Sequence, residues 1–398
     1  MEVRIEKLDH FGRGITYLED KICFVENALP GEIVDVNIVH RNKKYLEAKV
    51  VKYLKKSSMR INDECPYSSV CGGCVLGHMT YEVENQWKEE RIKEIFQRFT
   101  IVNPDKIKPI IFQDRNHYRN KIVLHGDGNS LGLFQEKTHQ IVPIDECLLV
   151  DEAINDCIKK ISKEKIEEVI IKTSNDGKDR MLSITGLVDD LDSVISDSQV
   201  VFLNGKCYTK QKQLLTKIGE KSFYESVHSF FQVNRTLTEK LYQAVVSHIK
   251  DKNYQTVLDL YCGTGTIGIF VSDFVQQVIG IDSNDSNILD AEKNKELNHI
   301  KNIKFICDKV ENQISSFENI DCIIVDPPRS GLDSKTKKYL HQIVSPSLIY
   351  VSCDSITLAR DIQDLSDIYD VIEVEPFNMF PRTYHVETVS VLYRKTIE

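Results

Sequence analysis

The 398-residue sequence contains no long hydrophobic run, and no window approaches the roughly 18 uninterrupted apolar residues of a membrane-spanning helix. Proline (10 residues) and glycine (18 residues) are scarce and no repeat is evident, which excludes collagen-like and largely disordered proteins. The residues from Met1 to Asp9 are charged and lack the apolar stretch of a secretory signal. These absences predict a cytoplasmic protein without a membrane partner, and the length predicts about two or three domains.

The basic residues are concentrated near the N-terminus, although the formal net charge of the whole chain is −9. Between residues 38 and 60, eight lysines and arginines stand against the single Glu47, a local net charge of +7. The first 57 residues also contain short alternating runs separated by turn signals, which predicts a small β-barrel of the OB type. A basic barrel is typical of nucleic-acid-binding modules, and a solvated strand face is the alternative. The expected strands are 3–8, 21–25, 32–39 and 46–53.

Cysteine is abundant for a chain without a secretory signal. The 11 cysteines are expected to be thiols, metal ligands or nucleophiles in a reducing compartment. Cys65, Cys71 and Cys74 form a C-x5-C-x2-C motif, which predicts a metal site that needs a fourth ligand. Four thiolates suit either tetrahedral zinc or an iron–sulfur cluster, and the spacing does not separate the two. The candidates for the fourth ligand are Cys147, Cys157 and His78.

The remaining sequence changes character twice. Residues 81–99 predict an amphipathic helix, because their apolar residues recur at helical spacing, and residues 105–222 are a mixed region of short strands. After Phe223, apolar runs of strand length alternate with helical stretches such as 286–297 and 334–343. This alternation predicts an α/β domain built on a parallel, doubly wound sheet. Its expected strands are 256–261, 278–282, 303–307, 322–326 and 348–352.

In a doubly wound fold, ligands bind at the carboxyl ends of the strands. There the first strand runs into a glycine-rich turn, Gly263-Thr-Gly-Thr-Ile-Gly268, and Asp282 ends the next strand, where its carboxylate can accept ribose hydroxyls. The glycine pattern fits both NAD and S-adenosylmethionine. Asp259 favours S-adenosylmethionine because a carboxylate can face its cationic methionine moiety. The stiff Asp326-Pro-Pro loop favours it as well, since paired prolines can hold a planar base beside the cofactor.

Cys353 lies where the fifth strand meets its helix, and the helix N-terminus is expected to favour its thiolate. Uracil C5 is a poor nucleophile toward a methyl sulfonium. Addition of a thiolate to C6 raises the electron density at C5, which then accepts the methyl group. The C5 proton must afterwards leave, and this requires a general base. Glu387 begins a late strand and is the candidate base.

Five motifs lie in order along the C-terminal half: Phe230-Phe-Gln-Val-Asn234, Leu258-Asp-Leu-Tyr-Cys-Gly-Thr-Gly265, Asp326-Pro-Pro-Arg-Ser-Gly331, Ser352-Cys-Asp-Ser-Ile-Thr-Leu-Ala-Arg-Asp361 and His385-Val-Glu-Thr388. With them the chain resembles the bacterial RNA uridine-C5 methyltransferases, and it is most similar to their iron–sulfur-containing 23S ribosomal RNA branch. The resemblance implies that Cys353 is the nucleophile and Glu387 the base. Ser355 replaces a proline common in the family, which puts the stiffness of that loop in question. The implied contacts with S-adenosylmethionine are Gln232, Tyr261, Asp282 and Asp326.

The resemblance also implies a domain organisation. Residues 1–57 are expected to form an RNA-binding TRAM barrel, residues 58–222 an α+β central domain, and residues 223–398 the methyltransferase domain. The helix at 81–99 is expected to pack on the catalytic domain although it follows the cysteine motif in sequence. A [4Fe–4S] cluster with a structural or RNA-positioning role is implied for the central domain. Its expected ligands are Cys65, Cys71, Cys74 and Cys147.

The expected activity is S-adenosylmethionine-dependent methylation of uridine C5 in a structured RNA. By the resemblance, 23S ribosomal RNA is the expected target and transfer RNA is the alternative. Two further alternatives are an NAD-linked iron–sulfur oxidoreductase, which the glycine pattern allows, and a non-catalytic RNA-binding factor, which the basic barrel allows. A protein partner is not implied, and a monomer is expected.

Overall fold

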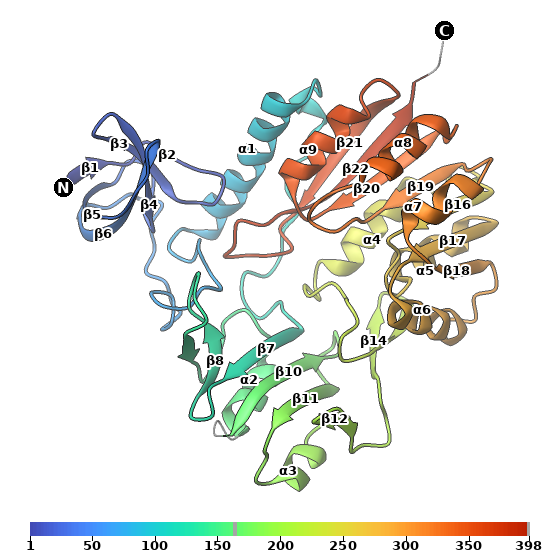
Figure 1. Ribbon diagram of the computed structural model, residues 1–398, viewed down its shortest axis with the longest axis horizontal. Helices are drawn as coiled ribbons and strands as arrows, with labels where there is room; N and C mark the ends of the chain where they lie inside the picture. The colour runs from blue at the N-terminus through green and yellow to red at the C-terminus, as the bar shows by residue number, and fades with distance from the viewer. Residues whose placement is uncertain (162–164, 396–398) are drawn as a thin grey trace.

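The structure, a computed structural model, describes residues 1–161 and 165–395. Three large sheets follow one another along the chain: one of six strands at the N-terminus, then two of seven strands (Figure 1). Helix α1 (Tyr81–Phe99) lies between the first sheet and the last. Within the described ranges, no helix combines the length and the apolarity that crossing a membrane requires.

The N-terminal strands form a curved sheet in the order β1-β5-β6-β4-β3-β2. Alternate residues point inward, so Cys23 and Val25 on β4 and Leu46 and Ala48 on β6 are fully buried in one core. This arrangement confirms the predicted module of strands. The strands are β1 (Glu2–Arg4), β2 (Lys7–Leu8), β3 (Gly14–Leu18), β4 (Lys21–Glu26), β5 (Ile33–Arg41) and β6 (Tyr45–Lys55).

Two details of this sheet differ from the sequence prediction. The single strand expected at 3–8 is wrong, because the chain changes partners there: Ile5 donates its N–H to the Glu32 carbonyl, whereas Glu6 donates to β3. Strand β3 itself was not expected, because its first residue, Gly14, is a turn signal in the sequence.

The middle sheet has the order β13-β12-β11-β10-β7-β8-β9, and α2 covers the core that its apolar residues form. The elements are β7 (Lys121–Gly126), β8 (Leu131–Phe134), β9 (Ile141–Pro143), α2 (Glu152–Lys160), β10 (Ile166–Thr173), β11 (Arg180–Gly186), α3 (Leu191–Ser196), β12 (Val200–Leu203) and β13 (Lys206–Cys207). A separate hairpin follows, β14 (Leu214–Ile218) and β15 (Lys221–Glu225). The Tyr224 N–H of this hairpin donates to Asn294 on α6 (Asp285–Leu297), and the Ser222 N–H donates to Asn298, the residue that follows α6. The domain boundary expected after residue 222 therefore falls inside β15.

The C-terminal sheet has the order β18-β17-β16-β19-β20-β22-β21, and β22 alone runs antiparallel to its neighbours. The crossover pattern and the helices on both faces confirm the predicted doubly wound fold. The strands are β16 (Thr256–Leu260), β17 (Gln277–Asp282), β18 (Ile303–Cys307), β19 (Cys322–Val325), β20 (Ser347–Ser352), β21 (Tyr369–Phe377) and β22 (Glu387–Arg394). The helices are α4 (Thr238–Ser247), α5 (Thr266–Val271), α6 (Asp285–Leu297), α7 (Val310–Gln313), α8 (Ser334–Gln342) and α9 (Ser355–Asp364).

Helix α1 is an N-terminal element in sequence and part of the C-terminal body in space. Its apolar face, with Ile92, Ile95 and Phe96, is buried in the same core as Leu258 of β16 and Leu358 of α9. Burying large aliphatic and aromatic side chains contributes roughly 1.5–3 kcal/mol each, so this contact fixes α1 firmly. The helix thereby joins the N-terminal part of the chain to the C-terminal body, and Figure 1 shows it beside α9.

Candidate active site

The chain leaves β16 in a tight turn with left-handed backbone conformations. Tyr261, Gly263 and Gly265 have φ angles of 62°, 55° and 77°. A Cβ atom at Gly265 would lie 2.5 Å from the ring of Phe305, so a side chain cannot be accommodated there. The absence of a side chain lets α5 begin directly against the carboxyl edge of the sheet, where a ligand can approach the backbone.

Buried carboxyl groups concentrate behind this turn. Asp259 is fully buried; its Oδ2 accepts the Gly268 N–H at 2.9 Å, and its Oδ1 has no hydrogen-bond partner among the described residues. Burial, with the nearby charges of Asp326 and Asp282, raises the pKa of Asp259 to about 8. Burial also raises the pKa of Asp326 to about 7. Such a group of carboxyls is stabilised by a cation placed among them, and the donor set therefore fits the sulfonium and ammonium groups of S-adenosylmethionine.

The other expected cofactor residues border the same turn. The Asp282 carboxylate accepts the N–H of Gly263 at 3.0 Å, and this bond holds the glycine-rich turn against the end of β17. The Tyr261 hydroxyl donates to Asp333 at 3.2 Å, at the start of α8. Gln232 is buried, and the preceding Phe231 packs in the same core cluster as α5. Tyr261, Asp282 and Asp326 thus lie at the carboxyl edge, directly after or at the ends of β16, β17 and β19, and the role of Gln232 stays a prediction.

Cys353 lies between β20 and α9 at this edge. Burial, together with the charges of Glu387 and Asp326, raises the pKa of the Cys353 thiol to about 11, and Arg329, which hydrogen-bonds to Cys353, opposes the rise. Burial and the two neighbouring carboxyls therefore act on the thiol in the direction opposite to the effect expected of the helix N-terminus. Arg329 belongs to the Asp326-Pro-Pro-Arg-Ser-Gly331 motif, but no role was predicted for it from the sequence.

Glu387 is the first residue of β22 and lies opposite Phe377 of β21. Its side chain is 2% exposed, and burial and the charge of Asp326 raise its pKa well above the ordinary value. Thr388, the residue after Glu387, pairs with Ser352, the residue before Cys353, and its hydroxyl donates to the Ser352 carbonyl at 3.2 Å. The predicted nucleophile and base therefore lie on neighbouring strand ends, and the charge of Glu387 acts on Cys353. A thiol, a buried carboxyl and an arginine therefore converge beside the glycine-rich turn.

The loop after Cys353 is held without a proline at Ser355. Asp354 caps α9, since its side chain accepts the N–H groups of Ile356 and Thr357 at 3.1 and 2.9 Å. The Ser352 hydroxyl accepts the Asp354 N–H at 3.2 Å, so the loop is tied at its other end too. These bonds restrain the loop even though Ser355 stands where the family commonly has a proline.

The four cysteines of the predicted metal site line one cavity. Cys65, Cys71, Cys74 and Cys147 border a space of about 250 Å³ between the cysteine turn and the middle sheet. Burial raises the pKa of the Cys65, Cys71 and Cys74 thiols, and the charge of Cys147 raises each further. The other candidate ligands lie elsewhere: Cys157 borders a second cavity, and His78 borders neither. In the described part of the chain, no three His, Cys, Asp or Glu side chains are arranged to hold one metal ion.

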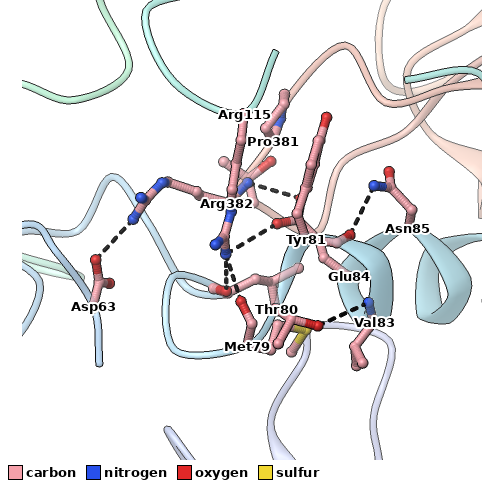
Figure 2. Close-up of polar contacts among 12 residues, drawn as sticks. Asp63, Met79, Thr80, Tyr81, Val83, Glu84, Asn85, Arg115, Pro381 and Arg382 are labelled. Carbon is pink, nitrogen blue, oxygen red and sulfur yellow. Dashed lines mark hydrogen bonds and ion pairs between the residues drawn. The ribbon is translucent and has the colours of Figure 1, made fainter. Parts of the chain in front are cut away.

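A segment between β21 and β22, residues 378–384, is held by groups from distant parts of the sequence. Figure 2 shows the centre of this arrangement, where Arg382 lies between Asp63 and the start of α1. Nothing in the local sequence of the segment indicated these contacts. The donors to its carbonyls are Asn234 to Met379, Lys88 to Phe380, Tyr118 to Pro381, Val75 and Leu76 to Arg382, and Arg91 to Tyr384.

The basic run lies on β5, β6 and the chain that follows, and only part of it is available to a ligand. Arg60 is buried in an ion pair with Glu32, and exposed Arg41 pairs with Glu19 at 2.6 Å. The loop between β2 and β3 reaches the catalytic body, where the ring of Phe11 packs edge-on against Tyr384 at 5.2 Å. The N-terminal sheet therefore borders the segment that precedes Glu387.

Comparison with known proteins agrees with this geometry. Residues 196–395 match the tRNA (uracil-5-)-methyltransferase family, and residues 1–51 match the TRAM domain. The chain is 33% identical to an uncharacterized RNA methyltransferase of Caldanaerobacter subterraneus subsp. tengcongensis, over 99% of this chain and 98% of the relative. It is 31% identical to an uncharacterized RNA methyltransferase of Clostridium acetobutylicum, over 99% and 96% of the two chains.

Among solved structures, the fold is similar to that of the Pyrococcus abyssi tRNA (uracil-54, C5)-methyltransferase in complex with S-adenosyl-L-homocysteine. The TM-score is 0.81 at 25% identity, over 98% of this chain and all of the other. The comparisons give no support to an NAD-linked oxidoreductase. The chain belongs to the tRNA (uracil-5-)-methyltransferase family of S-adenosylmethionine-dependent RNA methyltransferases, and it carries an N-terminal TRAM domain.

Proposed function

We propose that this enzyme methylates C5 of a uridine in 23S ribosomal RNA, with Cys353 as nucleophile and Glu387 as base. The observation that supports the roles is the convergence of Cys353, Glu387, Asp326 and Arg329 beside the glycine-rich turn. The ribosomal target rests on the cysteine set that distinguishes the resembled branch of the family. Transfer RNA is a second candidate, favoured by the similarity to the Pyrococcus abyssi enzyme.

The proposed reaction has two halves that use different residues. In the first, the Cys353 thiolate adds to uracil C6, and the electron pair of the C5=C6 bond moves toward C5 and O4. S-adenosylmethionine supplies the methyl group as an electrophile for C5. In the second, the Glu387 carboxylate accepts the C5 proton, the C5=C6 bond reforms, and the C6–S bond breaks to return the thiolate. Arg329 supports the first half because its charge opposes the raised pKa of the thiol.

The uracil ring can reach this site only if the target uridine is unstacked from its RNA and turned into the pocket. We assign affinity to the TRAM barrel, residues 1–57, and uridine selection to the catalytic edge. The contact of Phe11 with Tyr384 supports this division, because it holds the barrel beside the pocket and lets one RNA touch both. The exposed lysines of β6 and of the chain that follows it are the proposed phosphate contacts.

Mass mapping of 5-methyluridine tests the RNA target. In cells without this gene, at least one 23S ribosomal RNA position is expected to lose its methyl group, and the gene encoding the Cys353→Ala form is expected not to restore it. An unchanged ribosomal map with a missing methyl group in transfer RNA would replace the first candidate by the second. Unchanged maps of both RNA classes would contradict the proposed activity.

We further propose that Cys65, Cys71, Cys74 and Cys147 bind a [4Fe–4S] cluster. Thiols spread around a cavity of about 250 Å³ suit a larger inorganic group. Polar methyl transfer does not require electron transfer, so the proposed role is to fix the cysteine turn.

Iron and sulfide analysis of protein purified without oxygen tests the cluster. About four irons and four sulfides per chain are expected for a [4Fe–4S] group, and Cys147→Ser should lower this content severalfold. Cys157→Ser is the matched control, since Cys157 borders the other cavity and its replacement should leave the iron content unchanged. Stoichiometric zinc without sulfide would overturn this assignment while leaving the methyltransferase proposal intact.

A further inference from the structure

Arg382 is the largest of the fully buried side chains. Its φ angle is 65°, a left-handed conformation that residues other than glycine keep only where their surroundings hold them. Polar groups from three other segments hold Arg382 here. The backbone N–H donates to Glu84 at 2.9 Å, and the side-chain Nε donates to Asn116 at 3.0 Å. Arg382 is the one charged residue in the sequence of the 378–384 segment.

Arg382 holds both ends of the cysteine turn. Its guanidinium donates to Asp63 Oδ1 at 2.8 Å, and the same oxygen accepts the N–H of Cys65 at 3.0 Å. Its carbonyl accepts the N–H of Val75, the residue directly after Cys74, at 2.9 Å. The side chain also borders the cysteine cavity. A change in the shape of the cysteine turn must therefore move Arg382 or break these bonds.

The same residue belongs to the loop that presents Glu387. Strands β21 and β22 form a hairpin in which Phe377 lies opposite Glu387, and the 378–384 segment lies within the connection between them. Bonds to neighbouring carbonyls restrain this segment, including those from Tyr118 and Arg91. A displacement at Arg382 is consequently passed along a short, restrained backbone to the buried carboxyl of Glu387.

The nucleophile is held by different contacts. Cys353 is positioned by β20 and by the cap of α9, through Ser352 and Asp354, and neither contacts Arg382. Two bonds do connect the two sides. Arg91, which donates to the Tyr384 carbonyl, also donates to Ser355 Oγ at 3.4 Å. Thr388 donates to the Ser352 carbonyl at 3.2 Å. Because Arg382 makes neither bond, loss of its contacts should displace the base more than the thiol. Misplacement of a catalytic group by a fraction of an ångström to an ångström is enough to slow its step.

We infer that Arg382 is a positioning residue that couples the shape of the cysteine turn to the placement of Glu387. This inference rests on the proposed function, in which Glu387 removes the C5 proton. In this view the cysteine turn contributes to the elimination half of the reaction and not to methyl transfer. It gives the cysteine cavity a role in catalysis without electron transfer and without contact with the substrate.

A single-turnover experiment separates the two halves. Enzyme, S-adenosylmethionine and an in vitro transcript of the RNA identified by the mass mapping are mixed and quenched in denaturant. S-adenosylhomocysteine formation reports methyl transfer, and the methylated covalent enzyme–RNA adduct on a denaturing gel reports delayed elimination. With Arg382→Met, elimination is expected to slow about tenfold or more, while methyl transfer changes less than about threefold, so the adduct accumulates.

Two milder variants keep the test decisive if Arg382→Met does not fold. Asp63→Asn removes the charge that Arg382 contacts, and Arg382→Lys keeps a cation that can reach Asp63. Both are expected to accumulate adduct, to a smaller extent than Arg382→Met. Arg394→Met is the matched control, because Arg394 holds carbonyls at the other end of β22, at Leu340 and Ile343. It should leave the ratio of elimination to methyl transfer unchanged.

The outcomes distinguish this inference from the proposed function. If the unaltered enzyme forms 5-methyluridine but Arg382→Met slows both halves equally, or Arg394→Met accumulates the same adduct, the positioning role is wrong. If the unaltered enzyme forms neither adduct nor product with ribosomal or transfer RNA, the proposed function itself fails. Adduct accumulation in Arg382→Met and Asp63→Asn, absent from Arg394→Met, supports the coupling.

Discussion

Replacement of Cys353 by alanine is expected to lower methylation of RNA by about 10³-fold or more, because the reaction loses its nucleophile and C5 has no other source of electron density. The adduct with RNA that contains 5-fluorouridine should disappear with it. Cofactor binding should remain, since Asp259 and Asp282 and the glycine-rich turn are untouched. The measurements are S-adenosylhomocysteine formation, denaturing gels and titration with S-adenosylhomocysteine.

Cys207→Ala is the control for this prediction. Cys207 lies on β13 of the middle sheet, is partly buried like Cys353, and its thiol bonds only to groups of its own loop. Its replacement should leave turnover within about twofold of the unaltered enzyme, as is usual for a position away from the site. Retention of full turnover by Cys353→Ala would contradict the covalent mechanism and favour direct methyl transfer.

Replacement of Glu387 by glutamine is expected to separate the two halves of the reaction even more strongly than the Arg382 variants. Glutamine matches the shape of glutamate and cannot accept the C5 proton, so methyl transfer proceeds once and elimination stops. General bases of this kind contribute about 10²–10⁴-fold, and a loss of this size is expected in turnover. The methylated adduct should approach one equivalent per active enzyme on a denaturing gel.

A second carboxyl on the same hairpin provides the comparison. Glu375 lies on β21, is partly buried, and, like that of Glu387, its pKa is raised by burial. Glu375→Gln should not accumulate adduct, because this residue lies opposite Val389, two residues farther along β22 than Glu387, and its charge is not among the largest that act on Cys353. An adduct that fails to form in Glu387→Gln, with S-adenosylhomocysteine also missing, would assign Glu387 to substrate binding instead of elimination.

The catalytic edge could be predicted from the sequence because strand ends are recorded in short local patterns. A buried strand followed by glycine, or by Asp-Pro-Pro, or by Ser-Cys-Asp, marks its own carboxyl end, and parallel strands bring those ends together. Cys353 and Asp326 were found in this way, and so were the bounds of α1, whose apolar spacing is regular. In the structure, Asp326 directly follows β19 and Cys353 directly follows β20, at the edge that the patterns indicated.

What could not be predicted depends on contacts between distant residues. The raised pKa of Cys353 arises from burial and from the charges of Glu387 and Asp326, which the chain brings near it only in the folded state. The clamp on the 378–384 segment uses Lys88, Arg91 and the backbone after Cys74, and a buried arginine in a left-handed conformation has no local signature. Strand β3 was missed because its first residue, Gly14, is a local turn signal, whereas its pairing with β4 decides its structure.

The packing of α1 has a consequence for how the molecule is made. A ribosome releases Ile92 and Phe96 long before α9, the element that covers them, so during synthesis this apolar helix face has no native partner. Exposed apolar surface of this kind is a target for chaperones and for wrong association. Because α1 and α9 share one core, the C-terminal body needs a helix that the chain supplies before the middle sheet. A cut between the sheets would separate the C-terminal body from this helix.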